Sequence, residues 1–216
     1  MPLRTVILAA LLMMPRIMGA STADRIVASV GNLGITKSEV DQEVRFAQFL
    51  DGQAQTSEPS EAQGIAARDR LVEQTLLAQE AEADKVDEAG LPEEATRLVE
   101  EVRQLYPDEA AYQSALATTD FTQDQANQRL TRNVKILRLI NRRLRPKVWV
   151  ERREIETYYQ ETFLPEFAQR EKTSPPKLDE VETVIRETLT QQKVDQLLDQ
   201  WLKEVQSTRR VKLHSQ

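Results

Sequence analysis

The sequence predicts a mainly α-helical fold in which a small β element pairs the N-terminal and C-terminal strands. Only 6 glycines and 9 prolines occur among 216 residues, whereas folds that depend on many tight turns use more of both. Apolar residues recur at helical spacing along most of the chain. Two short β-branched segments, one near each end, predict strands instead. A chain of this length can bury a substantial core in one domain.

The first 23 residues have the composition of a secretory signal peptide. Arg4 supplies a positive start, residues 5–14 form an apolar run, and small residues follow through Ala23. The run is too short to cross a bilayer as a helix, which needs ~20 residues. We therefore expect export to the periplasm, with cleavage after Ala23 or Ala20. Because the sequence has no cysteine, an oxidising compartment would not affect it.

The mature chain is expected to begin with a strand at Arg25–Val30, followed by a turn at Gly31–Gly34. Thr36 and Glu39 have the spacing of a capping box, in which each side chain accepts a hydrogen bond from the backbone of the other. A first helix is predicted over Lys37–Leu50. Its inward-facing positions are Val40, Val44, Phe46 and Ala47.

Three further helices are predicted after a polar loop at residues 51–60. The second helix extends to about Lys85. Its inward positions are Ile65, Val72, Leu76 and Ala83. Pro92 opens the third helix, which ends before Pro107. Its apolar positions are Leu98, Val102 and Leu105. A brief fourth helix follows, with Tyr112, Ala115 and Leu116 on one face.

Thr122 and Gln125 predict another capping box, at the start of a fifth helix that reaches about Leu144. Its inward positions are Ala126, Leu130, Val134 and Leu137. Residues 148–150 form a short extended linker after Pro146. A sixth helix then presents an apolar and aromatic set, namely Ile155, Tyr158, Tyr159 and Phe163. Residues 164–177 include three prolines and are predicted to form a loop.

The last helix is expected over Leu178–Val205, which is ~40 Å long. Val211 and Leu213 alternate as in a strand. Isolated strands are not stable, so we expect this strand to pair with the N-terminal one. The predicted organisation is a signal peptide (1–23), a helical region (24–163), a proline-containing loop (164–177), and a helix and strand (178–216) that complete the same domain.

Several residue types and motifs that support catalysis or metal binding are missing from the sequence. There is no cysteine, and the only histidine is His214. Nucleophilic catalysis needs a nucleophile and a base within hydrogen-bond reach. The P-loop, the zinc-binding His-Glu-x-x-His pattern and the calcium-loop pattern are absent. Gly31 and Gly34 lack the third glycine of a dinucleotide site. We therefore expect no catalytic, cofactor-binding or metal-binding residues.

Charge is distributed unevenly along the chain. Residues 129–153 include ten basic residues and one acid, whereas residues 73–109 include twelve acids and three basic residues. We expect these stretches to form solvated helix faces that partly neutralise each other. The alternative is a weak contact between the basic stretch and an anionic membrane surface or acidic client segments. Nucleic acid is not an expected partner, because the chain has a net charge of −6 and is predicted to be exported.

Aromatic residues are few, and they gather between residues 149 and 167. At helical spacing such residues usually belong to a core. Adaptable binding surfaces also use exposed aromatic rings. The candidate residues for contact with a polypeptide client are Trp149, Tyr159, Phe163 and Phe167.

In the order of its elements, the chain resembles the N-terminal chaperone domain of the SurA family. This domain is shared with PrsA-like and PpiD-like foldases and is related in architecture to the chaperone region of trigger factor. The matching segments extend over nearly the whole mature chain: Ile26–Gly31, Ile35–Asp41, Leu71–Ala81, Val150–Tyr159, Val194–Leu202 and Val211–Leu213.

The resemblance implies an ATP-independent periplasmic chaperone for unfolded outer-membrane β-barrel precursors. Clients would bind a concave, partly apolar surface between the N-terminal helices and the last helix. Two features depart from the family. Glu151 stands where a Ser or Thr cap is usual, and residues 164–177 occupy the place of the parvulin prolyl isomerase domain. Because even a small domain takes ~50 residues, the resemblance implies chaperoning without isomerase activity.

Two other functions remain open from the sequence. One is a prolyl isomerase-type foldase with an unfamiliar site built from acidic and aromatic residues. The other is a structural subunit of envelope assembly with one fixed partner, for which the aromatic residues would form a permanent interface.

Overall fold

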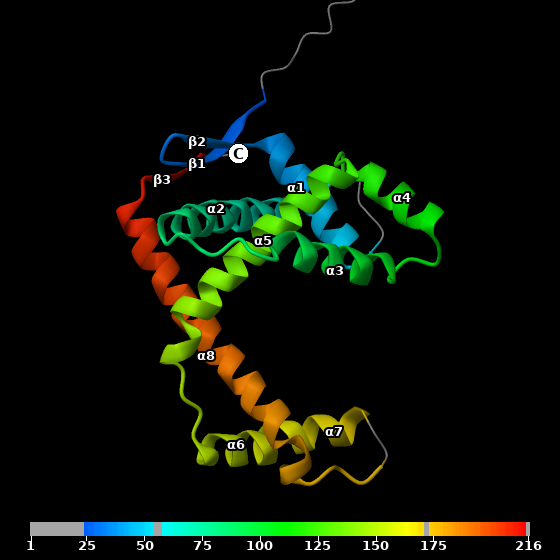
Figure 1. Cartoon of the computed structure of the whole chain (residues 1–216), viewed down its shortest axis with the longest axis vertical. Coiled ribbons are helices and arrows are strands. Elements are labelled where there is room, and N and C mark those ends of the chain that lie inside the picture. The colour runs from blue at the N-terminus through cyan, green and yellow to red at the C-terminus, as the bar shows by residue number, and fades with distance from the viewer. Residues whose placement is uncertain (1–23, 54–57, 171–172, 215–216) are drawn as a thin grey trace, which may run out of the picture.

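The computed structural model (Figure 1) describes residues 24–53, 58–170 and 173–214. The predicted signal peptide at 1–23 lies outside the described residues. The described chain is mainly helical, with a three-stranded antiparallel sheet in the order β2-β1-β3. Its elements are β1 (Ile26–Val30), β2 (Leu33–Thr36), α1 (Lys37–Leu50), α2 (Glu61–Ala83), α3 (Leu91–Arg103), α4 (Glu109–Thr118), α5 (Gln123–Arg143), η1 (Arg145–Lys147), α6 (Arg152–Tyr158), the π-helix η2 (Tyr159–Phe163), α7 (Leu164–Arg170), α8 (Leu178–Thr208) and β3 (Val211–Leu213).

The molecule has a body and an arm, which are connected by α8 (Figure 1). We define the arm as residues 148–193, comprising α6, η2, α7 and the first half of α8; the body is the remainder of the described chain. One core of the body lies under the sheet, between α2, the end of α5 and the end of α8. A second core joins α1, α3, α4 and the start of α5. The arm has a small core of its own, built around Val150, Ile155 and Ile185.

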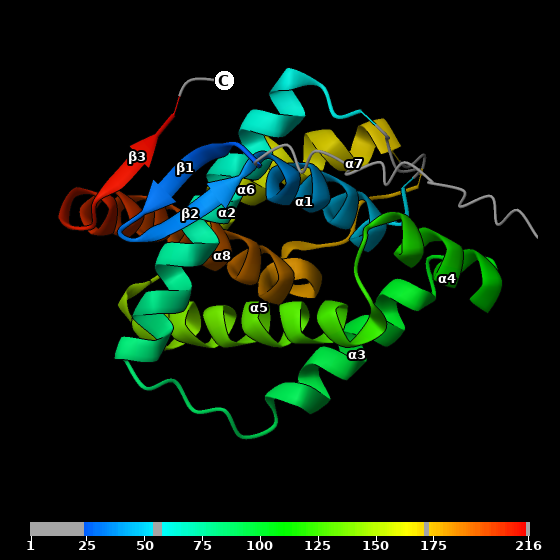
Figure 2. The ribbon, with the colours of Figure 1, turned by 90° about the horizontal axis from the view of Figure 1, so that it is seen from above.

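The N-terminal and C-terminal strands are paired, as the sequence predicts. β1 and β3 are antiparallel, and Ser29 lies opposite Lys212. The amide of Gly31 donates to the carbonyl of Arg210 at 2.9 Å, and the amide of His214 donates to the carbonyl of Val27 at 3.0 Å. This pairing holds the end of α8 beside β1 (Figure 2).

The predicted turn at Gly31–Gly34 is shorter than expected. Val30 pairs with Leu33, so the loop consists of Gly31 and Asn32 alone, and Leu33 and Gly34 belong to β2. Gly31 has a φ of +59°, as the first residue of a primed hairpin turn requires. β2, the strand that completes the sheet, therefore lies where the sequence predicted a turn.

The helix starts follow the predicted capping boxes. α1 has the predicted bounds, and the carboxylate of Glu39 accepts a 2.8 Å hydrogen bond from the amide of Thr36. At the start of α5, the amide of Thr122 donates to Gln125 Oε1 at 2.8 Å. In α1, Val40, Val44 and Phe46 are buried and Ala47 is half-buried.

Several predicted inward positions are wrong in α2, α3 and α5. Ile65 and Ala83 of α2 are exposed, as are Leu137 of α5 and Leu105, which lies beyond the end of α3. α2 packs against α1, α5, α8 and the sheet, so its buried side is wider than one stripe. α5 contributes Leu130 to the second body core but Ile136, Leu139 and Ile140 to the first. Its buried face therefore changes along its length and leaves Leu137 outside.

The prediction of a loop over residues 164–177 is wrong for its first half, because Leu164–Arg170 form α7. Pro165 lies inside a continuous helical run from Arg152 to Arg170, directly after the π-helix. The wider turn of the π-helix directly before it relieves the clash that proline makes with a preceding α-helical turn. Irregular chain remains at residues 173–177. Among the described helices, none has the length and apolar character that a membrane span requires.

Candidate functional site

Three aromatic rings of the arm are stacked in a row. The ring centroids of Tyr159 and Phe163 are 5.6 Å apart, and those of Phe163 and Phe167 are 6.0 Å apart. All three side chains are half-buried. We call these three residues the aromatic ladder. The structure thus brings together three of the four predicted client-contact residues.

The π-helix and the arm core hold the aromatic ladder in place. Tyr159 and Phe163 are the first and last residues of η2, and π-helical turns occur frequently at functional sites. Both side chains pack against the arm core. The hydroxyl of Tyr159 donates to the carbonyl of Pro176 at 2.8 Å, which fastens the ladder to the segment that enters α8. Phe167 lies at the outer end and stacks on Phe163.

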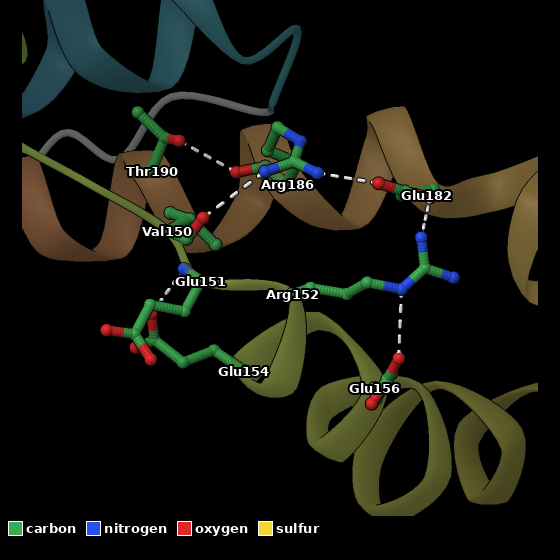
Figure 3. Close-up of polar contacts among 8 residues, drawn as sticks. All are labelled: Val150, Glu151, Arg152, Glu154, Glu156, Glu182, Arg186 and Thr190. Atoms are coloured by element: carbon green, nitrogen blue, oxygen red, sulfur yellow. Dashed lines mark hydrogen bonds and ion pairs between the residues drawn. The ribbon is translucent and has the colours of Figure 1, made fainter.

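A polar network attaches α6 and the linker to α8 (Figure 3). Arg186 donates to the carbonyl of Val150 at 3.2 Å and to Glu182 at 2.6 Å. Arg152 donates to Glu156 at 3.0 Å and lies 3.8 Å from the other oxygen of Glu182. Both α6 and the linker are therefore held to the same two turns of α8.

Trp149 lies apart from the aromatic ladder. Its side chain is 78% exposed, and the described ring contacts do not join it to the ladder. Lys193 donates to the carbonyl of Trp149 at 2.7 Å and to Glu154 at 2.8 Å. The bond from Lys193, helped by the amide of Glu151, holds the pKa of the Glu154 carboxyl below its usual value. The backbone of Trp149 is therefore fixed while its ring extends into solvent.

Glu151 begins α6 without the usual Ser or Thr. Its amide donates to the carboxylate of Glu154 at 2.8 Å, so the third residue of the helix supplies the cap. A hollow of about 350 Å³ lies along this side of α6, and its lining includes Glu154, Tyr158 and Leu189. The arm therefore has a shallow, partly polar recess as well as the ladder.

The solvent-facing side of α8 is polar, which the predicted apolar capture surface did not anticipate. Val184 is an exposed exception. The exposed positions include Thr183, Glu187, Gln191, Gln192, Asp195, Gln196, Asp199, Gln200, Lys203 and Glu204. The last helix therefore offers no continuous apolar stripe to a client.

The basic stretch at 129–153 is largely neutralised by acids of α2, α3 and the segment between them, as predicted. Lys135 binds Glu82 and Glu88, and these hydrogen bonds raise the pKa of its ammonium group. The other pairs of this interface are Arg138–Glu94, Arg142–Asp84, Arg143–Glu80 and Arg143–Asp84. Within the described chain, no ion pair joins Arg132, Lys147 or Arg153 to an acid.

Sequence reasoning missed two parts of the site. The π-helix has no sequence signal beyond the proline that follows it. The stacking of Phe167 on Phe163 was hidden by the predicted loop, although the spacing of four residues between successive rings is a helical signal. Among the described residues, no three acidic or histidine side chains form a group suited to a metal ion.

The chain was also compared with known proteins. No protein-family model matches the sequence. No curated protein matches it with significant similarity. The resemblance to the SurA N-terminal domain therefore stays a prediction, and the structure in hand carries the functional argument.

Proposed function

We propose that this protein is an ATP-independent periplasmic chaperone of the SurA type, which binds unfolded outer-membrane β-barrel precursors and performs no covalent chemistry. The observation that carries the proposal is the aromatic ladder. Three stacked rings stand half-exposed on an arm that has its own core, and Trp149 extends into solvent from the same arm.

The geometry of the ladder suits weak and general binding. Its rings are fixed by η2 and by the Tyr159 hydrogen bond, so little conformational entropy is lost when a client binds. An aromatic contact contributes about 0.5–1.5 kcal/mol beyond area burial. Several such contacts capture a chain that exposes aromatic and aliphatic side chains. Because each contact is weak, a client leaves without the hydrolysis of a nucleotide.

The test is suppression of aggregation. A urea-unfolded β-barrel protein is diluted into buffer without nucleotide, and light scattering is followed with and without an excess of this protein. We expect the wild type to slow aggregation. Phe167→Ser and Trp149→Ser are expected to weaken the effect, and the double variant to weaken it further. Phe167 and Trp149 are chosen because neither belongs to the arm core.

Leu105→Ser is the matched control, since Leu105 is an exposed apolar residue of the body. It is expected to suppress aggregation as the wild type does, with circular dichroism confirming that each variant is folded. A wild-type protein that leaves aggregation unchanged would contradict the proposal. Turnover of proline peptides in a protease-coupled assay would favour a foldase instead. A single stoichiometric partner in envelope extracts would favour an assembly subunit.

A further inference from the structure

Two adjoining hollows open between β2, α1, α2 and α5. Their volumes are about 290 and 330 Å³. Both are lined by Leu33, Leu71, Thr75, Arg129 and Arg132, so they form one continuous depression, which we call the hairpin groove. The hairpin lies across α2 at this place (Figure 2). The groove is in the body and is separate from the aromatic ladder.

We propose that the hairpin groove binds an extended polypeptide segment in which a carboxylate side chain lies next to aliphatic ones. This inference deepens the proposed function, on which it rests, by assigning a second client-binding site and the chemistry of the segment that fits it. Three features of the groove support it: a partly apolar floor, an arginine that has no ion pair within the described chain, and an open strand edge.

The floor of the groove is partly apolar, because Leu71 and Ala78 lie among polar side chains of α2. Leu71 and Ala78 of α2 line it from below, and Leu33 overhangs it from β2 with 54% of its side chain exposed. An aliphatic side chain placed between Leu33 and Leu71 would remove apolar surface from water on both sides.

The charges of the groove leave one cation free. Glu43 is bound by Arg129 and lies 3.5 Å from Arg70. Glu82 is bound by Lys135 at 2.7 Å. Glu39 has no ion pair within the described chain; its carboxylate caps α1 by accepting from the amide of Thr36. Arg132 is exposed, and within the described chain it forms no ion pair. A carboxylate on the occupant would supply the missing partner.

The side of the groove formed by β2 is an open sheet edge, because β2 is paired only with β1. In a hairpin with a two-residue loop, the two residues that flank the loop, here Val30 and Leu33, form hydrogen bonds with each other. The amide and carbonyl of the next residue along each strand point away from the partner strand. This places the amide and carbonyl of Gly34 on the free side, where Gly34 also lines the groove. Thr36 follows the same alternation, since its amide donates to Glu39 and not to β1. An extended segment can therefore add to this edge.

The test uses fluorescence anisotropy with two labelled peptides of alternating valine and threonine. One has a central aspartate and the other an asparagine at the same place. We expect the aspartate peptide to bind the wild type on the order of 5-fold more tightly. Arg132→Glu should abolish this preference. Gly34→Pro removes the edge donor and should weaken both peptides alike. Because a Cβ at this position lies 3.3 Å from Ile26 Cδ1, circular dichroism must show that the variant is folded.

Arg97→Glu is the matched control, because Arg97 is exposed on α3 and has no ion pair within the described chain. It should leave both affinities unchanged. Equal affinity of the wild type and Arg132→Glu for the aspartate peptide would overturn the inference. So would capture of anionic vesicles in place of the peptide. If the wild type still suppresses aggregation in that case, the proposed function stands and only the hairpin groove assignment fails.

Discussion

The carboxylate of Glu43 connects three helices from a position that is 5% exposed. It binds Arg129 of α5 and lies near Arg70 of α2. Glu43→Gln keeps the shape but removes the charge that compensates Arg129. Because a glutamine oxygen still accepts a hydrogen bond, we expect the free energy of unfolding to fall by about 1–3 kcal/mol. Urea titration followed by circular dichroism measures the change. Glu156→Gln, in the surface pair with Arg152, is the control; an equal shift in both would argue against this role.

Glu73 gives stability a pH dependence. Burial raises the pKa of its carboxyl, and the nearby charges of Asp69 and Asp199 raise it further against the opposing charge of Arg70. The folded protein therefore binds this proton more tightly than the unfolded chain does. The stabilisation from the protonated carboxyl is full below the ordinary value of 4.5 and is lost as the pH rises through the raised pKa.

Glu73→Gln should accordingly raise the free energy of unfolding at pH 7 by less than about 1 kcal/mol. The gain should disappear below the ordinary glutamate pKa, where the wild-type carboxyl is neutral in both states. Urea midpoints at neutral and acid pH measure it, with Glu101→Gln on the exposed side of α3 as control. A gain of the same size at both pH values would exclude the electrostatic cause.

At the scale of elements, β3 pairs with β1 and so joins the end of α8 to the sheet. Arg210 and His214 both form backbone hydrogen bonds to the β1 side of the strand. Because the direction of backbone groups alternates along a strand, the amide of Lys212 points toward β1 and that of Leu213 points away from it. Lys212→Pro removes the amide that donates to β1 and should lower the free energy of unfolding by about 1 kcal/mol or more. It should also speed hydrogen exchange of the β1 amides. Leu213→Pro alters only the free edge and should do much less; similar effects of the two would contradict the pairing.

Local signals in the sequence predicted the elements they control. Thr36 with Glu39 and Thr122 with Gln125 marked helix starts, because a capping box is a contact between residues three apart. The pairing of the terminal strands was predictable because an isolated strand needs a partner. β2 was missed because Leu33 and Gly34 look like a turn when the two-residue loop is not recognised.

The remaining errors depend on tertiary contacts. Leu137 faces solvent because α5 packs against different helices at its two ends. Pro165 predicts a loop, but the helix continues past it because a π-helical turn lies directly before it. For the candidate site, the sequence indicated the aromatic residues but not their stacking. It gave no sign of the hairpin groove, whose walls come from segments far apart in the chain.

At the scale of the molecule, Arg186 connects the linker before α6 to the first half of α8, inside the arm. It binds both the carbonyl of Val150 and the carboxylate of Glu182. Arg186→Ala should loosen the linker and α6 while leaving the body intact, because the body cores do not include this region. Limited proteolysis with mass spectrometry should then show faster cleavage within residues 148–177. Lys203→Ala, on the body half of α8, should be cleaved as the wild type is; a uniform increase over the whole chain would contradict a local effect.

Because α8 is one uninterrupted helix that extends through both the arm and the body, it sets the distance between them. Its 31 residues extend for about 46 Å. The paired strands β1 and β3 lie at one end, and the aromatic ladder lies near the other. A stretched polypeptide covers about 3.3 Å per residue, so a segment of roughly 14 residues matches that length. The proposed function therefore predicts that peptides well below this size occupy one of the two proposed sites at a time, whereas longer chains gain avidity by occupying both.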